Sequence, residues 1–320
     1  MSERYDAIVI GAGHNGLVCA ALLGKAGRKV LVLEANEMVG GAAVTREFAD
    51  GYSVSACAHL LYQLQPAVQK DLGLKVDLAA DQLNTIALAT DGQHVRVNGD
   101  TVSGVGDEDV ASYRQFHKRM TRFADLLNTY FNTMPPRLSK DASRSDMLTL
   151  ARLGFDVRRL GRTEMQAFLR LIGMNIRDEV VERFESGLLR GAISLDAVLG
   201  THLGPRSPNT ILTYLYRLAG AHGRLQQPAG GMGAVTESLA TAARNNGVVI
   251  RTGMPVKRIR IEDGRVTGVE TTAGESFASP LVVSNADPKS TIMCLVGAKN
   301  VEAGFTRSIH HLRSRGNAAK

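Results

Sequence analysis

A glycine-rich turn near the start of the chain constrains the fold more than any other feature. The apolar residues 8–10 lead into the turn at 11–16, which reads GAGHNG, and an apolar-periodic run follows at 17–23. A second apolar run at 30–33 ends on the acid Glu34. This order of strand, glycine turn, helix, strand and acid predicts the first βαβ unit of a dinucleotide-binding α/β fold.

Each glycine of the turn has a physical role in such a unit. Gly11 permits a tight turn after the strand, Gly13 lets the backbone approach a pyrophosphate, and Gly16 lets the helix pack closely on the sheet. The unpaired N–H groups and partial positive charge of the helix N-terminus favour the phosphates. Glu34 is placed to accept hydrogen bonds from a ribose 2′-hydroxyl, and it would repel a 2′-phosphate, which argues against NADP.

A second glycine pair, Gly40-Gly41, follows Glu34 closely. Bare backbone at this pair can lie against a phosphate or a ring system. FAD is long enough to need a second loop of this kind, whereas NAD is not. The pair therefore favours FAD, and an NAD-dependent dehydrogenase is the alternative that the first βαβ unit leaves open.

The bulk composition places the chain among globular proteins and excludes several classes. With 320 residues, 44% hydrophobic and 22% charged, it exceeds one ordinary domain and can bury a sizeable core. No apolar run reaches the length of a membrane span. The three cysteines are far apart and form no C-x-x-C pair, so we expect neither a metal site nor dithiol chemistry.

Charge and the chain start suggest partners and location. The net charge is +7, but no basic stripe interleaved with aromatic residues appears, so we expect no nucleic-acid partner and read the surplus as solvated surface. The first strand begins at about residue 5, which leaves no room for a targeting segment and predicts a cytoplasmic protein.

The pattern changes between the two ends of the chain. Short alternating segments at 85–104 predict hairpins, and an apolar stripe from Val110 to Tyr130 predicts a long helix. The stripe could line a substrate cavity, but a core role is the more common one. Residues 145–200 are mostly helical in pattern, and the arginines at 152, 158, 159 and 162 suggest a solvated face.

A sheet pattern then resumes. Glycines at 230, 231 and 233 precede a predicted helix at 234–245, and strands are predicted at 248–252 and from Val256. The Asp263-Gly264 pair predicts a tight hairpin. A buried parallel-type strand at 281–283 ends in small polar residues, at the kind of sheet edge where ligands bind.

The stretches at 11–17, Glu34 and 40–45, with the PAGGMG segment at 228–233, resemble the phytoene desaturase and carotenoid isomerase branch of the FAD-dependent amine-oxidase-type flavoproteins. The resemblance implies an α/β fold, with a Rossmann-like FAD-binding domain of the GR2 type and an inserted, mainly helical substrate or cap domain. It implies the divisions 1–104 and 221–297 for the two parts of the FAD-binding domain and 105–220 for the cap. It also places backbone contacts to adenine at Val256. The expected FAD-binding residues are Gly11, Ala12, Gly13, His14, Asn15, Gly16, Glu34, Ala35, Gly40, Gly41, Ala42, Val256 and Ala286.

The resemblance also implies a function. Such flavoproteins pass hydride from an apolar or amine-like substrate to flavin N5 and need no dedicated general base, so no catalytic residue is nominated. Cys57 and His59 invite catalytic interpretations, but a structural role for each is favoured. A flavin-binding regulatory or interaction protein with little turnover is the second hypothesis, since the eukaryotic relatives include proteins tied to mitochondrial function.

The end of the chain differs from the usual pattern of the branch. Its members continue beyond this length with more cap and a closing glycine-rich segment. We therefore expect residues 298–320 to begin a truncated cap segment, with a strand starting at 310–316. A protein partner, or a missing C-terminal section, would then complete the site.

Overall fold

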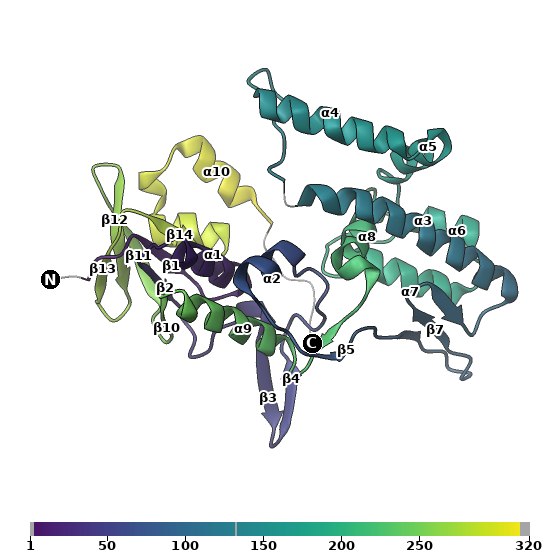
Figure 1. Ribbon diagram of the computed structural model, residues 1–320, viewed down its shortest axis with the longest axis horizontal. Helices are drawn as coiled ribbons and strands as arrows, with labels where there is room; N and C mark the ends of the chain where they lie inside the picture. Colours follow the sequence, from purple (N-terminus) through teal and green to yellow (C-terminus); the bar gives the residue numbers. More distant parts are fainter. Residues whose placement is uncertain (1–2, 132, 314–320) are drawn as a thin grey trace. The chain divides into compact units, whose positions relative to one another are not determined.

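The computed structural model describes residues 3–131 and 133–313, which form two compact units (Figure 1). The sheet unit comprises residues 1–60, 65–80 and 227–320, and the helical unit comprises 61–64 and 81–226. The expected divisions lay at 104 and 220 instead. Residues 85–103 group with the helical unit because their short strands pack against its helices. The functional domain boundaries stay a prediction.

The centre of the sheet unit is a parallel sheet in the order β10-β2-β1-β14. Its strands are β1 (Ala7–Ile10), β2 (Val30–Leu33), β10 (Val249–Arg251) and β14 (Val282–Ser284). Every residue of β1 and β2 is buried, as expected for apolar strands with both faces covered. The strand predicted at 281–283 is present as β14, parallel to β1, but its residues are half-buried, so the expected burial is wrong.

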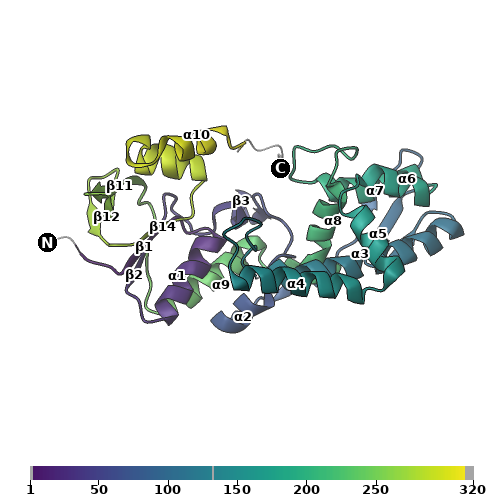
Figure 2. The ribbon, with the colours of Figure 1, turned by 90° about the horizontal axis from the view of Figure 1, so that it is seen from above.

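Alternation along β1 divides its side chains between two cores. Ala7 and Val9 pack against α1 (His14–Lys25) and α9 (Met232–Asn245), which lie side by side (Figure 2). Ile8 and Ile10 face the opposite way, into a core shared with the antiparallel sheet of β11 (Val256–Glu262), β12 (Arg265–Thr271) and β13 (Ser276–Ala278). The period of two in a strand thus produces three layers.

The first helix begins earlier than the sequence suggested. α1 starts at His14, with Gly13 in extended conformation as its N-cap, so Gly16 lies within the first helical turn and not before it. The Asp263-Gly264 hairpin is confirmed: both residues have positive φ, at 49° and 73°, and they join β11 to β12. Such a pair is typical of a type I′ turn.

Smaller elements surround the parallel sheet. They are η1 (Gly41–Ala43), β3 (Thr45–Ala49), β4 (Tyr52–Ser55), α2 (Pro66–Leu72), β5 (Leu78–Ala80) and β9 (Gln227–Pro228). β3 pairs with β4, and β5 with β9, both antiparallel.

The helical unit packs around α3 (Asp107–Phe131). Its other elements are α4 (Arg144–Arg159), α5 (Arg162–Leu171), α6 (Ile176–Arg183), α7 (Gly187–Val198), α8 (Thr210–Ala219), η2 (Gly220–Gly223), β6 (Thr85–Ala87), β7 (Val95–Asn98) and β8 (Thr101–Ser103). Tyr113, Phe116, Met120 and Phe123 of the predicted stripe are buried in one core with residues of α5 to α8. The core interpretation of the stripe is confirmed.

The last described segment forms helices. The π-helical turn η3 (Ser290–Val296) and the short η4 (Ala298–Asn300) precede α10 (Ala303–His311). The strand expected at 310–316 is therefore wrong for residues 310 and 311, which end a helix, and positions 314–316 lie outside the described residues. Among the described residues, no helix combines the length and the apolar character needed to cross a bilayer.

Candidate functional site

The first glycine turn lies at the carboxyl end of β1. The Gly11 N–H donates to the Leu33 carbonyl at 2.8 Å, and Gly11 has a φ of +93°. A Cβ added to Gly16 would stand 2.2 Å from the carbonyl oxygen of Gly11. Only a residue without a side chain therefore lets the first turn of α1 approach the glycine turn this closely.

The second glycine pair lies directly against the first turn. The Gly40 N–H donates to the Ala12 carbonyl at 2.9 Å, and Gly13 and Gly40 form an isolated parallel bridge. A Cβ on Gly41 would come within 3.2 Å of Gly13 Cα. The two segments that the sequence assigned to one long ligand thus share one edge of the parallel sheet.

The Glu34 carboxylate holds the first glycine turn in place. Its side chain is buried, and Oε2 accepts a hydrogen bond from the Ala12 N–H at 2.7 Å. Oε1 accepts from the Asn36 N–H at 3.0 Å and from Asn36 Nδ2 at 2.8 Å. A carboxylate offers about four acceptor positions, so it can hold the turn and still accept from a ribose hydroxyl. The sequence had assigned it the second role alone.

Asn285 is the residue that sequence reasoning missed. It follows β14, and its N–H donates to the Ile10 carbonyl at 2.8 Å. Its Nδ2 would lie 2.8 Å from a Cβ on Gly13 and 3.1 Å from one on Gly16, so the carboxamide rests on the glycine turn. Among the described residues the carboxamide has no hydrogen-bond partner. Its place after the apolar strand predicted at 281–283 was the available signal.

The remaining expected residues divide by position. His14 and Asn15 open α1, and Ala42 lies in η1. Ala286 follows Asn285, with its N–H donating to Ser284 Oγ at 3.3 Å. Val256 begins β11, just after a segment in which the Met254 N–H donates to the Glu34 carbonyl at 2.8 Å. Ala35 is exposed beside Glu34. Their contacts with FAD stay a prediction.

The third glycine segment serves a structural purpose. Thr45 Oγ1 accepts from the Gly233 N–H at 2.9 Å, and Ser55 Oγ accepts from the Met232 N–H at 3.0 Å. These side chains, paired across β3 and β4, satisfy the N-terminus of α9. A Cβ on Gly231 would stand 2.6 Å from Thr45 Oγ1, which explains glycine at that position.

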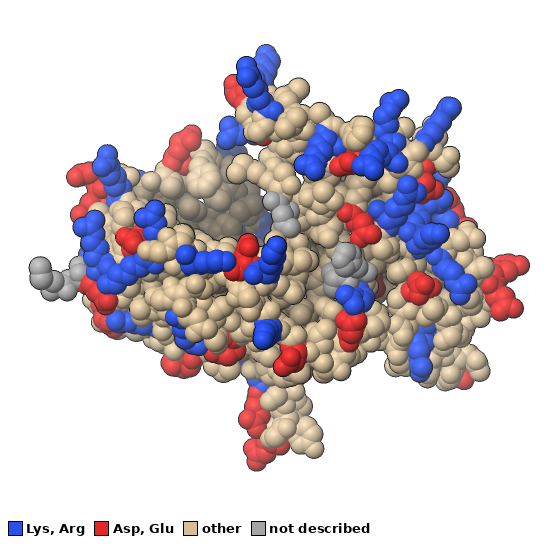
Figure 3. Space-filling model, viewed as in Figure 1, with Lys and Arg blue, Asp and Glu red and all other residues tan. Residues whose placement is uncertain are grey.

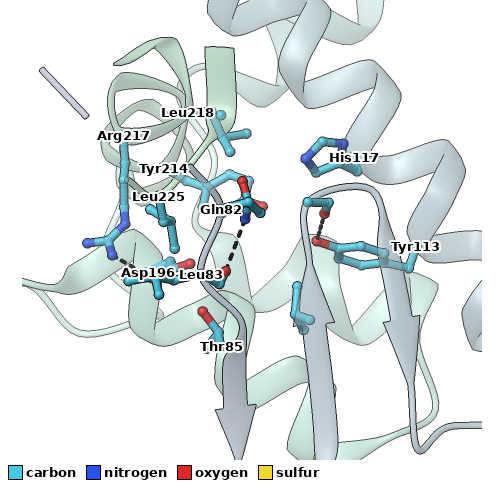
Figure 4. Close-up of a pocket in the computed structure, with 13 residues that line it drawn as sticks. Gln82, Leu83, Thr85, Tyr113, His117, Asp196, Tyr214, Arg217, Leu218 and Leu225 are labelled. Atoms are coloured by element: carbon cyan, nitrogen blue, oxygen red, sulfur yellow. Dashed lines mark hydrogen bonds and ion pairs between the residues drawn. The ribbon is translucent and has the colours of Figure 1, made fainter. Parts of the chain in front are cut away.

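A separate small cavity lies within the helical unit (Figure 4). Tyr113 and His117 of α3 stand on one side of it, and Asp196 of α7 and Arg217 of α8 stand on the other. The cavity holds about 40 Å³. That is space for one or two water molecules, far below the several hundred Å³ of a ligand pocket.

The polar groups of this cavity are strongly affected by burial. Burial raises the pKa of Asp196, and Arg217, whose Nη2 lies 3.1 Å from Asp196 Oδ1, opposes that shift. Burial lowers the pKa of His117, which favours the neutral imidazole. The Tyr113 hydroxyl donates to the Gly99 carbonyl at 2.8 Å. The cluster is a buried polar network within a core.

Cys57 and His59 lie on the loop after β4, and both are exposed, so neither fills a core. The three cysteines are free. In the part of the chain that the structure describes, no group of His, Cys, Asp or Glu side chains could hold a metal ion.

Comparison with known proteins bears directly on this geometry. The sequence pattern of the flavin containing amine oxidoreductases matches residues 16–292. The chain belongs to this family. The chain is 28% identical to pyridine nucleotide-disulfide oxidoreductase domain-containing protein 2 of Mus musculus, with 100% of this chain and 60% of that protein covered. It is 27% identical to the neurosporene-forming phytoene desaturase of Cereibacter sphaeroides, with 92% and 55% covered.

The fold agrees with the family. The solved structure of a putrescine oxidase redesigned in its cofactor binding matches with a TM-score of 0.60 at 17% identity, over 97% of this chain and 64% of that one. The expected α/β fold, the phytoene desaturase-like character and FAD as the cofactor are confirmed. The chain spans about 60% of the length of the mouse relative.

The residues at the sheet edge fit FAD. The missing Cβ atoms of Gly13 and Gly41 leave bare backbone where a side chain would stand, and the N-terminus of α1 opens beside it. The unpartnered carboxamide of Asn285 adds two N–H donors of the kind that a phosphate accepts from.

Proposed function

We propose that this flavin containing amine oxidoreductase takes hydride from an apolar or amine-like substrate. The observation that carries the proposal is the convergence of both glycine segments and the buried Glu34 at the carboxyl edge of the parallel sheet. This edge is where ligands bind in open α/β sheets. When bound, FAD supplies the redox chemistry, because its isoalloxazine ring accepts the hydride at N5.

The chain's own residues bind and orient. Glu34 would hold the ribose end through charge-assisted hydrogen bonds, and the N–H groups at the start of α1 would bind the pyrophosphate. The names of two similar proteins, a phytoene desaturase and a putrescine oxidase, support an apolar polyene and an amine as the substrate classes to test.

Two measurements on the purified chain test the proposal. Chromatography of the nucleotide released by denaturation should give FAD, and release of NAD would overturn the assignment. Anaerobic addition of an aliphatic diamine, or of an apolar polyene in detergent, should bleach the flavin absorbance with one of the two. If dithionite bleaches the flavin and neither compound does, the chain holds FAD without this turnover.

The Gly13→Val variant tests the proposed path of the pyrophosphate. Its side chain would meet Asn285 Nδ2, which stands 2.8 Å from the added Cβ, and would fill the space of the pyrophosphate. Because the Asn285 carboxamide is the end of a flexible side chain and can turn away, the variant should fold with an unchanged circular dichroism spectrum. It should retain no flavin, because the valine side chain fills the space of the pyrophosphate. A flavin-loaded Gly13→Val protein would contradict the proposed path of the pyrophosphate.

A further inference from the structure

The solvent-facing side of α4 combines basic and large apolar side chains. No residue of α4 is buried, although it is an amphipathic helix of 16 residues. Leu148 is 73% exposed, and Met147 and Phe155 are each 60% exposed. We call this surface the basic-apolar face; its residues are Arg144, Met147, Leu148, Arg152, Phe155, Arg158 and Arg159.

The other side of α4 explains which way the helix faces. Val157 packs against the core of the helical unit, and Asp156 accepts a hydrogen bond from the Tyr130 hydroxyl at 2.6 Å. Asp146 turns back into the capping box, where it accepts from the Ser143 N–H at 2.8 Å. Within Arg144–Arg159, all of which the structure describes, Asp156 is thus engaged on the inner side and Asp146 in the N-terminal cap, and both are half-buried.

The basic-apolar face itself carries no acid, and the exposed Asp141 is the nearest acid in the preceding loop. Its four arginines form no salt bridge with any described residue. Blue Lys and Arg side chains project along the edge where α4 lies (Figure 3). The preceding loop adds Met134 and Leu138, each 85% exposed, with Arg137 and Lys140 between and after them. A solvated face explains the arginines but not the five large apolar side chains among them.

We propose that the basic-apolar face docks on an anionic lipid surface. Met147 and Leu148 lie in the first half of α4 and Phe155 in the second, on a helix about 24 Å long at 1.5 Å per residue, so the helix would lie flat in the headgroup layer. Arginine suits that layer, because its methylene stem stays in apolar surroundings while its guanidinium reaches the lipid phosphates. A protein partner would instead have to supply acids matched to four guanidinium groups, whereas lipid phosphates supply that negative charge over the whole surface.

Sedimentation with vesicles tests the proposal on the full chain. Vesicles of phosphatidylcholine with about a third phosphatidylserine should carry the protein down, whereas pure phosphatidylcholine should carry far less. Because each basic residue near such a surface contributes about fivefold in partitioning, the Arg144→Gln/Arg152→Gln double variant should bind about 25-fold more weakly. The Leu148→Ala/Phe155→Ala double variant should lose binding to both kinds of vesicle.

Matched controls lie elsewhere in the helical unit. Arg114→Gln on α3 and Leu195→Ala on α7 also replace exposed side chains, and neither should change the partitioning. All of the substituted side chains are exposed, so the variants should keep the wild-type circular dichroism spectrum and flavin content. Equal losses in the controls would overturn the assignment to α4.

The absence of tryptophan from the sequence allows a direct reporter. A Phe155→Trp protein should emit at shorter wavelength when phosphatidylserine vesicles are added, whereas a Phe48→Trp protein, altered on exposed β3, should not. No shift for Phe155→Trp would overturn the proposal. So would a concentration-dependent dimer that Leu148→Ala/Phe155→Ala abolishes without any vesicle binding, since a second copy would then cover the face.

Discussion

Two close backbone approaches and one backbone-to-carboxylate hydrogen bond decide whether the sheet edge can form. The Gly16 position faces the Gly11 carbonyl, the Gly41 position faces Gly13, and Ala12 donates to Glu34. The two glycine contacts join groups that a side chain would separate. At this scale the molecule is therefore sensitive to single carbon atoms, because interiors are packed without spare volume.

Gly16→Ala tests the closest of these contacts. Its Cβ would stand 2.2 Å from a backbone carbonyl that cannot rotate away, so α1 must shift, and we expect a loss of about 2 kcal/mol in the free energy of unfolding. Gly154→Ala is the control, since nothing lies within 4 Å of its Cβ on exposed α4, and it should gain up to about 1 kcal/mol. Urea unfolding followed by circular dichroism measures both. An unchanged midpoint for Gly16→Ala would contradict the packing argument.

Glu34→Ala tests the anchor. The variant loses the acceptor of the Ala12 N–H and the partner of the ribose, and we expect FAD binding weakened by about 1.5 to 3 kcal/mol. Titration calorimetry of the deflavinated protein with FAD gives the affinity. The control variant Glu37→Ala removes a nearby exposed acid and should change the affinity for FAD little. Equal affinities for wild type and Glu34→Ala would remove Glu34 from the site.

Side chains from residues distant in sequence cap helix ends and so join one element to another. Thr45 and Ser55 cap α9 from the β3–β4 hairpin. In the helical unit, Asp109 of α3 is buried and accepts from the N–H groups of Glu185 and Ser186, each at 2.8 Å. Ser186 is the N-cap of α7, so this carboxylate joins the start of α7 to α3.

Asp109→Ala tests that junction. It leaves two part-buried N–H groups without their charged acceptor, so we expect a loss of about 3 kcal/mol in the stability of the helical unit. Asp107→Ala removes an exposed acid from the same helix turn and should cost only a few tenths of a kcal/mol. Hydrogen exchange of α7 amides reports the local change, and equal protection in the two variants would refute the role of Asp109.

At the scale of the whole molecule, the two units have separate cores with different chemistry. The sheet unit buries mainly aliphatic residues on both sides of its parallel sheet. The helical unit surrounds a small polar cavity with buried titratable groups. We therefore expect the pH response of stability above pH 5 to depend strongly on the helical unit.

His117 should make the helical unit less stable as the pH falls. Burial holds its pKa below the ordinary value of 6.5, so the unfolded chain binds the proton more readily. The contribution of neutral His117 to the stability of the folded state is therefore complete above pH 6.5 and is lost as the pH falls below that value. Thermal unfolding at pH 7.5 and 5.5 should show wild type losing more stability than His117→Gln. Parallel losses in both proteins would show that His117 does not titrate in this way.

Local patterns were enough to predict much of the fold. The β1–α1–β2 unit, the Asp263-Gly264 hairpin and the core stripe of α3 all follow from residues near one another in sequence. Periodicity and turn preferences act over a few residues, so they can be read directly. The helix at 303–311 was not foreseen, because its short apolar pattern is shared by strand and helix.

The sequence by itself determined the family, the glycine turns and the acid at Glu34, because these lie within a short stretch and each has one main physical use. Only the tertiary structure brought Asn285 onto Gly13, placed Thr45 and Ser55 at the start of α9, and paired Asp156 of α4 with Tyr130 of α3. These contacts join residues from different elements. They depend on strand order and helix packing, which local propensities do not encode.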